Sequence, residues 1–161
     1  LGLPAEMLDA QGGTDITAVR PRYITLNRGV EHLTCMSLSE EGTLRWYTSC
    51  CGTPVGNTPR DFKTSHVGLI HCCLNTDGRS LDEVLGPVVM RISGKSAKGK
   101  VESNSPIRFG LAVAHYLASI TLSRISRSYL INPFFQIPQG IPLVKPKVLS
   151  PAERAALLDA T

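Results

Sequence analysis

The chain has no run of about 18 consecutive apolar residues, so the sequence gives no reason to expect a membrane-spanning helix. It also has no P-loop, no dinucleotide-binding glycine fingerprint, no G-x-S-x-G elbow and no H-E-x-x-H pair. Neither an internal repeat nor a low-complexity run interrupts it. These absences argue against a membrane partner and against the nucleotide-binding, hydrolase and metalloprotease classes that those motifs mark.

The chain also lacks a strong charge of either sign. It has 17 Lys and Arg against 13 Asp and Glu, a net charge of +4 over 161 residues. The basic residues are scattered, and Ser, Ala and Gly interrupt the densest group at residues 95–100. We interpret that group as a solvated loop and not as a phosphate-binding patch, so we predict no nucleic-acid partner.

The cysteine pattern argues against a disulfide framework. There are five cysteines, an odd number that leaves at least one thiol free, and four of them form the adjacent pairs 50–51 and 72–73. Neighbouring cysteines rarely bond to each other, and the chain carries no recognisable signal peptide. We therefore expect a cytoplasmic protein with reduced thiols. The chain opens on Leu1 and not on methionine, which we take to indicate either a trimmed chain or a further segment upstream.

A length of 161 residues, 42% of them hydrophobic, fits one domain with a core that needs no disulfides. Short apolar or alternating runs bounded by turn residues predict strands in the first part of the chain, with Trp46 as a core anchor. The predicted strands cover residues 23–27, 32–38, 44–49, 67–74 and 88–92. A capping box at residues 80–83 predicts one helical turn.

The remainder of the sequence predicts a long helix, an extended tail and a short closing helix. Apolar residues at helical spacing predict one long packing helix at about 106–129. The four prolines of 133–149 predict an extended tail that lies on another part of the protein and has no fold of its own. Ser150-Pro151-Ala152-Glu153 predicts a closing helix. We therefore predict a single α+β, mainly β domain over 1–161, with a β core at about 5–93 and the Pro-rich tail and terminal helix at 133–161.

The most informative segment runs from the strand at 44–49 into a cysteine-bearing turn and then Gly52-Thr53-Pro54, the shape of a zinc knuckle. Such a knuckle normally reads C-x-x-C, so that both thiolates reach one metal. Here Thr48 stands three residues before Cys51 and supplies a hydroxyl in place of a thiol. Because successive residues of an extended strand point to opposite faces, we do not expect Cys50 and Cys51 to chelate one ion together.

This knuckle resembles that of the glutathione-dependent formaldehyde-activating enzyme (GFA)-like superfamily, most closely a bacterial branch with a degenerate zinc knuckle. The matching segments are residues 8–16, 44–47, 50–58 and 67–71 and the Pro-rich ending 142–154, so the resemblance covers most of the chain. It implies a β-tent fold, in which folded-over antiparallel sheets surround a zinc site.

The resemblance implies that, in that family, an N-terminal C-x-C pair and the knuckle together hold one zinc. A second zinc uses a C-x-C-x-x-C cluster associated with glutathione adducts. Only Cys51 matches a knuckle ligand in this chain, and no cysteine precedes Cys35, so the other ligands would have to lie upstream of Leu1. We therefore expect no cofactor for the chain as given, and zinc if an upstream cysteine segment is present.

The candidate site residues follow from these patterns. Cys50, Cys51 and Cys73 are the candidate metal ligands, and His71 shares a strand face with Cys73. Buried packing of small sulfur side chains is the favoured alternative. The candidate ligand-binding residues are Arg45, Asn57, Thr58 and His71. For Asn57 and Thr58 we favour hydrogen bonding within the turn as the alternative role.

Three functions remain open. We favour a metal-free or metal-poor module that binds a small molecule, by resemblance a glutathione adduct. The first alternative is a zinc-dependent carbon–sulfur lyase acting on a glutathione-aldehyde adduct, if upstream cysteines complete the site. The second is a structural protein that forms homo-oligomers through the long helix and the tail. Whether the chain is an enzyme stays open at this stage.

Overall fold

The computed structural model describes residues 7–71, 74–92, 97–100 and 105–159. Over these ranges the chain forms a mixed six-stranded sheet, a small second sheet, a helix of 20 residues and a short C-terminal helix. The fold is therefore α+β, as the sequence predicted. The buried core lies on the sheets and on the segment that follows the long helix.

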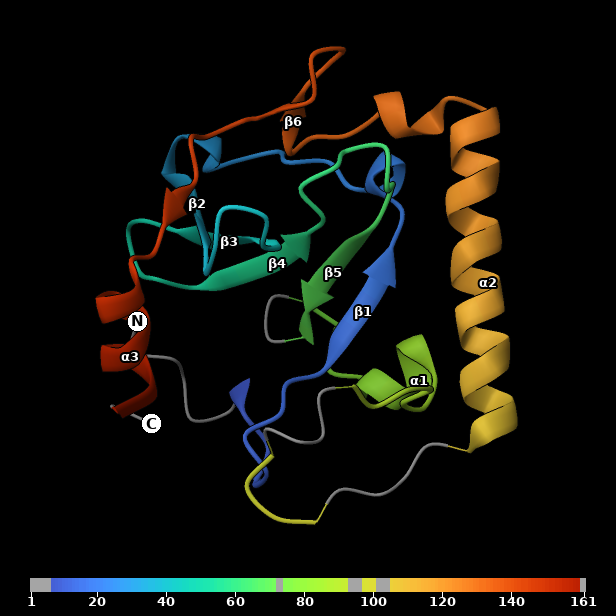
Figure 1. The fold of residues 1–161 in the computed structure, drawn as a ribbon. Coiled ribbons are helices and arrows are strands. Elements are labelled where there is room, and N and C mark those ends of the chain that lie inside the picture. Colours follow the sequence, from blue (N-terminus) through green and yellow to red (C-terminus); the bar gives the residue numbers. More distant parts are fainter. Residues whose placement is uncertain (1–6, 72–73, 93–96, 101–104, 160–161) are drawn as a thin grey trace.

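The large sheet has the strand order β1-β5-β4-β3-β2-β8 (Figure 1). Its strands are β1 (Ile16–Val19), β2 (Leu33–Ser37), β3 (Leu44–Thr48), β4 (Pro54–Thr58), β5 (Val67–Ile70) and β8 (Lys147–Val148). All neighbours pair antiparallel except β2 and β8, which are parallel. The small sheet is the hairpin of β6 (Phe135–Gln136) and β7 (Ile141–Pro142).

The alternating patterns of β2 and β3 produce one buried face, as predicted. Leu33, Cys35 and Ser37 of β2 are buried while the residues between them are half-buried. On β3, Leu44 and Trp46 are buried in the same way, and Cys35 lies opposite Trp46 in the strand register. Because successive side chains of a strand point to opposite faces, the apolar side chains at alternate positions of β2 and β3 all point toward the same core.

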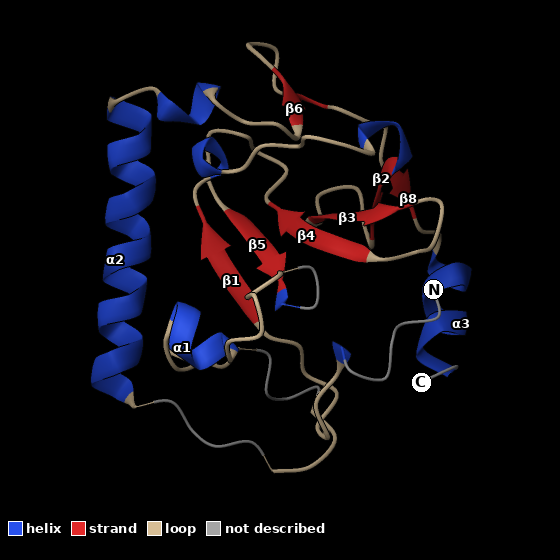
Figure 2. Cartoon of the chain, turned by 180° about the vertical axis from the view of Figure 1, so that it is seen from behind, coloured by secondary structure: helices blue, strands red, loops and turns tan. Residues whose placement is uncertain are grey.

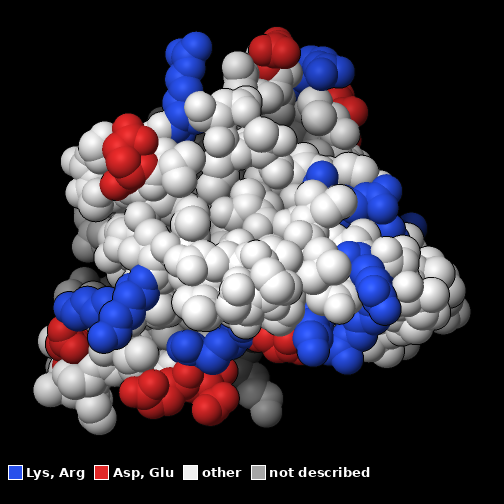
Figure 3. Space-filling view, turned by 90° about the horizontal axis from the view of Figure 1, so that it is seen from above, with Lys and Arg blue, Asp and Glu red and all other residues white. Residues whose placement is uncertain are grey.

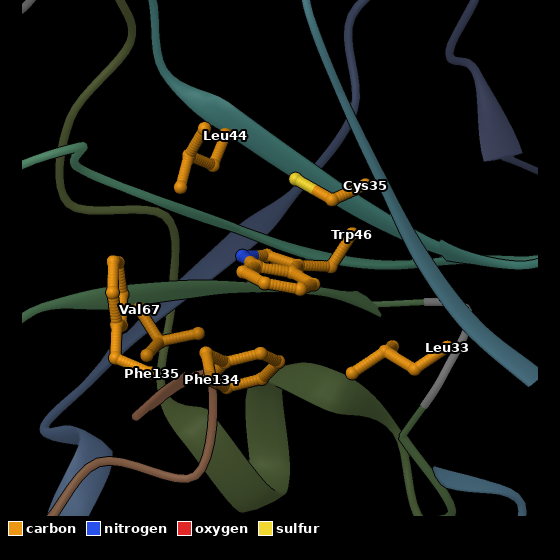
Figure 4. Close-up of a cluster of buried hydrophobic side chains, with 7 residues drawn as sticks. All are labelled: Leu33, Cys35, Leu44, Trp46, Val67, Phe134 and Phe135. Atoms are coloured by element: carbon orange, nitrogen blue, oxygen red, sulfur yellow. The ribbon is translucent and has the colours of Figure 1, made fainter. Parts of the chain in front are cut away.

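Trp46 is the centre of that core. Its side chain is 1% exposed, and its ring centroid lies 5.1 Å from that of Phe134 and 6.4 Å from that of Phe135. In the close-up of Figure 4, Cys35 lies on one side of the indole and Phe134 on the other. The indole Nε1–H donates to Thr58 Oγ1 at 2.9 Å, so the only polar atom of this side chain is satisfied inside the core.

The Pro-rich segment lies on the rest of the domain, as predicted, and it is also a structural part of the core. It contributes Phe134 and Phe135 to the core, forms the β6–β7 hairpin, and supplies β8 to the edge of the large sheet. Proline cannot donate within a central ladder, but strands of two residues at an edge tolerate it. The β core therefore extends beyond the predicted limit at residue 93.

Two of the predicted strands are also wrong. Pro21–Tyr23 forms a 3₁₀ turn and residues 24–27 are irregular. Residues 88–92 are irregular and exposed, with Val89 61% and Ile92 68% accessible. β-propensity reflects how well a side chain suits a pleated surface. A segment of high β-propensity forms a strand only where another strand lies beside it to pair with. The predicted strand at 67–74 is confirmed as β5 at its start, while residues 72–73 lie outside the described ranges.

The predicted helix boundaries agree with the structure more closely. α1 (Leu81–Leu85) begins at Ser80 with both hydrogen bonds of the capping box. α2 (Pro106–Ile125) is followed by a 3₁₀ turn at Ser128–Leu130, which together correspond to the predicted 106–129. α3 (Pro151–Asp159) follows Ser150 as predicted. Figures 1 and 2 place α2 beside β1 and α3 at the opposite side of the molecule.

Helix α2 packs less completely than the prediction of a packing helix implied. Its contacts with the domain include polar and aromatic groups: Arg20 Nε donates to Ser119 Oγ at 2.9 Å, and the His66 and Tyr116 ring centroids lie 5.0 Å apart. Its outer face keeps large apolar side chains accessible, with Ile107 and Ile125 each 76% exposed. The predicted oligomeric contact through this helix stays a prediction. None of the helices within the described ranges is long and apolar enough to cross a membrane.

Charge is dispersed over the face shown in Figure 3. Lys and Arg side chains surround a central area of uncharged residues, and acidic groups lie beside several of them (Figure 3). Among the described residues, Arg124 and Asp61 form an ion pair in which the Nη2 and Oδ2 atoms are 3.1 Å apart. The absence of a nucleic-acid partner stays a prediction.

The first testable prediction concerns the segment after α2. Phe134→Ala should lower the free energy of unfolding by about 3–5 kcal/mol, because it removes a fully buried aromatic ring and leaves a cavity beside Trp46. Urea unfolding followed by tryptophan fluorescence measures the loss. Ile141→Ala, at a side chain 53% exposed in the same segment, is the matched control and should change stability far less. Equal midpoints for Phe134→Ala and wild type would contradict this description of the core.

Candidate functional site

The β3–β4 hairpin positions the cysteine turn. Its register runs Arg45 opposite Asn57 and Trp46 opposite Gly56, and then shifts so that Tyr47 lies opposite Pro54. This irregularity places one extra residue on β4 and marks a β-bulge directly before the turn. Bulges twist a hairpin locally and re-aim the side chains that follow, which is why they occur often beside functional sites.

The turn itself is closed by backbone hydrogen bonds. Thr48 N–H donates to the Thr53 carbonyl at 2.9 Å, and Gly52 N–H donates to the Thr48 carbonyl at 2.8 Å. Gly52 adopts a φ of 70°, the left-handed region that glycine occupies without strain. Ser49 also binds the residue that precedes β2, since its N–H and hydroxyl donate to the His32 carbonyl at 2.8 and 3.1 Å. The turn is therefore held on both sides.

The Cys51 thiol lies among hydrogen-bonding groups. Its Sγ is 3.0 Å from Thr48 Oγ1, 3.1 Å from Thr53 Oγ1 and 3.6 Å from Cys50 Sγ. Thr53 N–H donates to Thr48 Oγ1 at 3.1 Å, which orients the Thr48 hydroxyl. Both cysteines are exposed, so this group of atoms opens to solvent. We refer to Thr48, Cys50, Cys51 and Thr53 as the thiol cluster.

This geometry stabilises a thiolate at Cys51. The hydrogen bond with Thr48 and then those with Thr53 lower the pKa of Cys51 from 9.0 to about 6. Hydroxyl and amide donors favour the charged form of an acceptor, so these contacts increase the fraction of thiolate near neutral pH. Cys35 shows the opposite behaviour, because burial raises the pKa of its thiol to about 11. Of these two thiols, only Cys51 is both accessible and readily ionised.

The candidate metal ligands are only partly brought together. Cys50 and Cys51 lie in a turn and not on an extended strand, so our expectation that their side chains point apart is wrong: the sulfur atoms are adjacent. Thr48 and Cys51 also approach each other as the two ends of a C-x-x-C pair would. Cys73 lies outside the described residues. Within the described ranges no three His, Cys, Asp or Glu side chains converge as metal ligands.

The candidate ligand-binding residues occupy different places. Arg45 and Asn57 are half-buried cross-strand neighbours, and burial lowers the pKa of the Arg45 guanidinium. Thr58 is 1% exposed and its hydroxyl accepts a hydrogen bond from the Trp46 indole N–H, so it is a buried core residue. His71 lines a separate hollow of about 140 Å³, where its Nδ1 lies 3.3 Å from the Asp15 carbonyl oxygen.

The role of the two threonines was missed by the sequence reasoning, which counted Thr48 only as a lost thiol. The usable signal was the spacing. A hydroxyl three residues before Cys51 and another two residues after it can both reach its sulfur in a tight turn. Thr53 is half-buried and lies where β4 begins, so the strand fixes it.

Comparison with known proteins assigns a family but no activity. The family described as "Family of unknown function (DUF6151)" matches residues 1–125, and the chain belongs to this family. Searches of curated proteins and of solved structures gave no match. The family match ends with the last residue of α2, so the segment that carries Phe134 and β8 lies beyond it.

The second prediction tests the relation of Thr48 to Cys51. Thr48→Cys should raise the affinity for Zn²⁺ by at least about tenfold, because it restores a C-x-x-C pair whose side chains already lie in contact. Competition with a chromophoric chelator measures this affinity. Thr48→Ser, which keeps the hydroxyl, is the control. Unchanged zinc affinity in Thr48→Cys would contradict the knuckle-like geometry.

Proposed function

We propose that this member of the DUF6151 family is a metal-poor module that binds a small molecule through the Cys51 thiolate. The observation that carries the proposal is the pair of threonine hydroxyls at 3.0 and 3.1 Å from an exposed sulfur. A thiolate is the nucleophilic form of cysteine, and an accessible thiolate reacts reversibly with a carbonyl carbon or with a disulfide sulfur.

The cluster explains why Cys51 would be the contact atom. A negative charge on its sulfur is stabilised by hydrogen bonds from Thr48 and Thr53 and by the Cys50 S–H, which donates at 3.6 Å. A ligand that reacts with Cys51 removes that charge and leaves the two hydroxyls free to donate to the ligand's own oxygen or sulfur atoms. The Thr48 and Thr53 hydroxyls would then donate to the thiolate in the free protein and to the ligand in the complex.

A GFA-like β-tent remains our proposal for the ancestry of the fold. Supporting it are the almost wholly antiparallel large sheet and the position of the cysteine turn at a hairpin that follows the Trp46 strand. By resemblance the ligand would be a small sulfur compound such as a glutathione adduct. The hydroxyl of Thr48 in the place of a knuckle thiol favours binding without zinc.

The zinc-dependent carbon–sulfur lyase is the alternative, and the metal content separates the two. A tetrahedral protein site uses about four ligands, of which the cluster supplies two adjacent thiols. Emission spectrometry of purified protein should give less than about a tenth of a zinc per chain for the metal-poor module. About one zinc per chain would favour the lyase and would mean that other residues complete the site.

The third prediction follows the ionisation of Cys51. In a Cys50→Ser variant, the rate of alkylation of Cys51 by iodoacetamide should rise with a midpoint near pH 6, because the thiolate forms as pH passes the pKa of about 6. Thr48→Val in the same background should move this midpoint upward and slow the reaction at pH 6 by roughly threefold or more. Mass spectrometry of the tryptic peptide 46–60, whose only thiol is then Cys51, measures the rate.

A serine at position 48 should keep the midpoint near that of the parent, since it keeps the hydroxyl. A midpoint for Cys51 at or above the ordinary thiol range near 8.5 would contradict the proposed role of the cluster.

A further inference from the structure

We infer that Cys50 and Cys51 act together as a thiol–disulfide exchange pair, in which Cys51 attacks a small disulfide and Cys50 resolves the product. The inference rests on the proposed function, because it needs Cys51 to be the reactive thiol. It adds a substrate class, a low-molecular-weight disulfide, and a role for Cys50 that neither the knuckle pattern nor the binding proposal supplies.

The geometry of the turn separates the two roles. Cys51 Sγ has both threonine hydroxyls in contact, whereas the contact recorded for the Cys50 thiol is its donation to Cys51 Sγ at 3.6 Å. Cys51 Sγ therefore has two hydroxyls within reach that can donate to it when it is an anion, and Cys50 lies beside it as an S–H donor. Both are exposed, so a disulfide can approach Cys51 from solvent.

The reaction is balanced in two steps. The Cys51 thiolate attacks one sulfur of a disulfide RSSR, a Cys51 S–SR bond forms, the RS–SR bond breaks, and RS⁻ leaves. The Cys50 thiol then loses its proton to solvent or to the departed RS⁻ and attacks Cys51 Sγ. The Cys50–Cys51 disulfide forms as the second RS⁻ leaves. Starting from the Cys51 thiolate, the pair loses two electrons and the one proton of Cys50, and RSSR becomes two RSH by taking up these two electrons, that proton and a second proton from solvent.

The product would be easily reversed. Adjacent Cα atoms are about 3.8 Å apart across a trans peptide, below the roughly 4.4–6.8 Å that unstrained disulfides span. Strained and exposed disulfides are the readily reduced ones, which suits a switch better than a structural bridge. Closing the pair also removes the negative charge from Cys51 Sγ, so the hydrogen bonds from Thr48 and Thr53 to a thiolate are lost on oxidation.

Oxidised glutathione is a suitable probe, and the chain allows a clean readout. Trypsin releases peptide 46–60, which contains Cys50 and Cys51 and no other cysteine, while Cys72 and Cys73 fall in peptide 64–79. At pH 6 the wild-type peptide 46–60 should become lighter by two hydrogens without retaining a glutathionyl group. Cys50→Ser should accumulate one glutathionyl group on Cys51, because no thiol resolves the adduct.

Cys51→Ser should form an adduct at this peptide at least about tenfold more slowly at pH 6, because it removes the sulfur that lies in contact with both threonine hydroxyls. Cys35→Ser, which removes a buried thiol, is the matched control and should behave as wild type. Dithiothreitol should reverse each modification.

Different results would contradict the exchange reaction of the Cys50–Cys51 pair and the proposed binding function of Cys51. A glutathionyl adduct that persists in wild type as it does in Cys50→Ser would overturn the resolving role while leaving the reactive Cys51 in place. Equal reaction rates for Cys51→Ser and Cys50→Ser would overturn the assignment of Cys51 as the attacking thiol. Failure of Cys51 to react with both oxidised glutathione and iodoacetamide would overturn the inference and the proposed function together.

Discussion

The hydrogen bond from the Trp46 indole to Thr58 Oγ1 is the constraint on which the rest of the structure depends. Both side chains are 1% exposed, so water cannot replace either partner. A buried donor left without an acceptor costs about 1–3 kcal/mol, and a one-residue slip of β3 against β4 would break this bond and turn Trp46 out of the core. The bond thus fixes the register of the hairpin, and with it the place of the cysteine turn.

The contacts of the Cys51 thiol in the turn depend on that fixed register. Because the bulge follows Trp46 directly, Thr48 and Thr53 close the hairpin and both hydroxyls reach Cys51. A thiol at position 48 would share a metal with Cys51, whereas a hydroxyl donates a hydrogen bond to it. In our proposal the side chain at position 48 therefore decides between metal binding and thiolate stabilisation.

Much of this architecture could be predicted from sequence, because local patterns determine it. The alternation in β2 and β3, the anchor role of Trp46 and the caps of α1 and α3 are local, and the structure confirms them. The pairing of Phe134 with Trp46 links residues 88 positions apart, which no local pattern encodes. The adjacency of the sulfur atoms of Cys50 and Cys51 depends on the turn geometry, and an extended-strand assumption predicted the opposite.

The central claim is that Cys51 is a thiolate at neutral pH because Thr48 and Thr53 donate to it. The most direct measurement is an NMR titration of protein labelled with ¹³C at the cysteine Cβ atoms, since this shift reports ionisation of each thiol without a chemical reaction. Cys51→Ser identifies the Cys51 signal. The account predicts that this signal titrates with a midpoint near pH 6. A Cys51 signal that stays in the thiol form until above about pH 8 would contradict it.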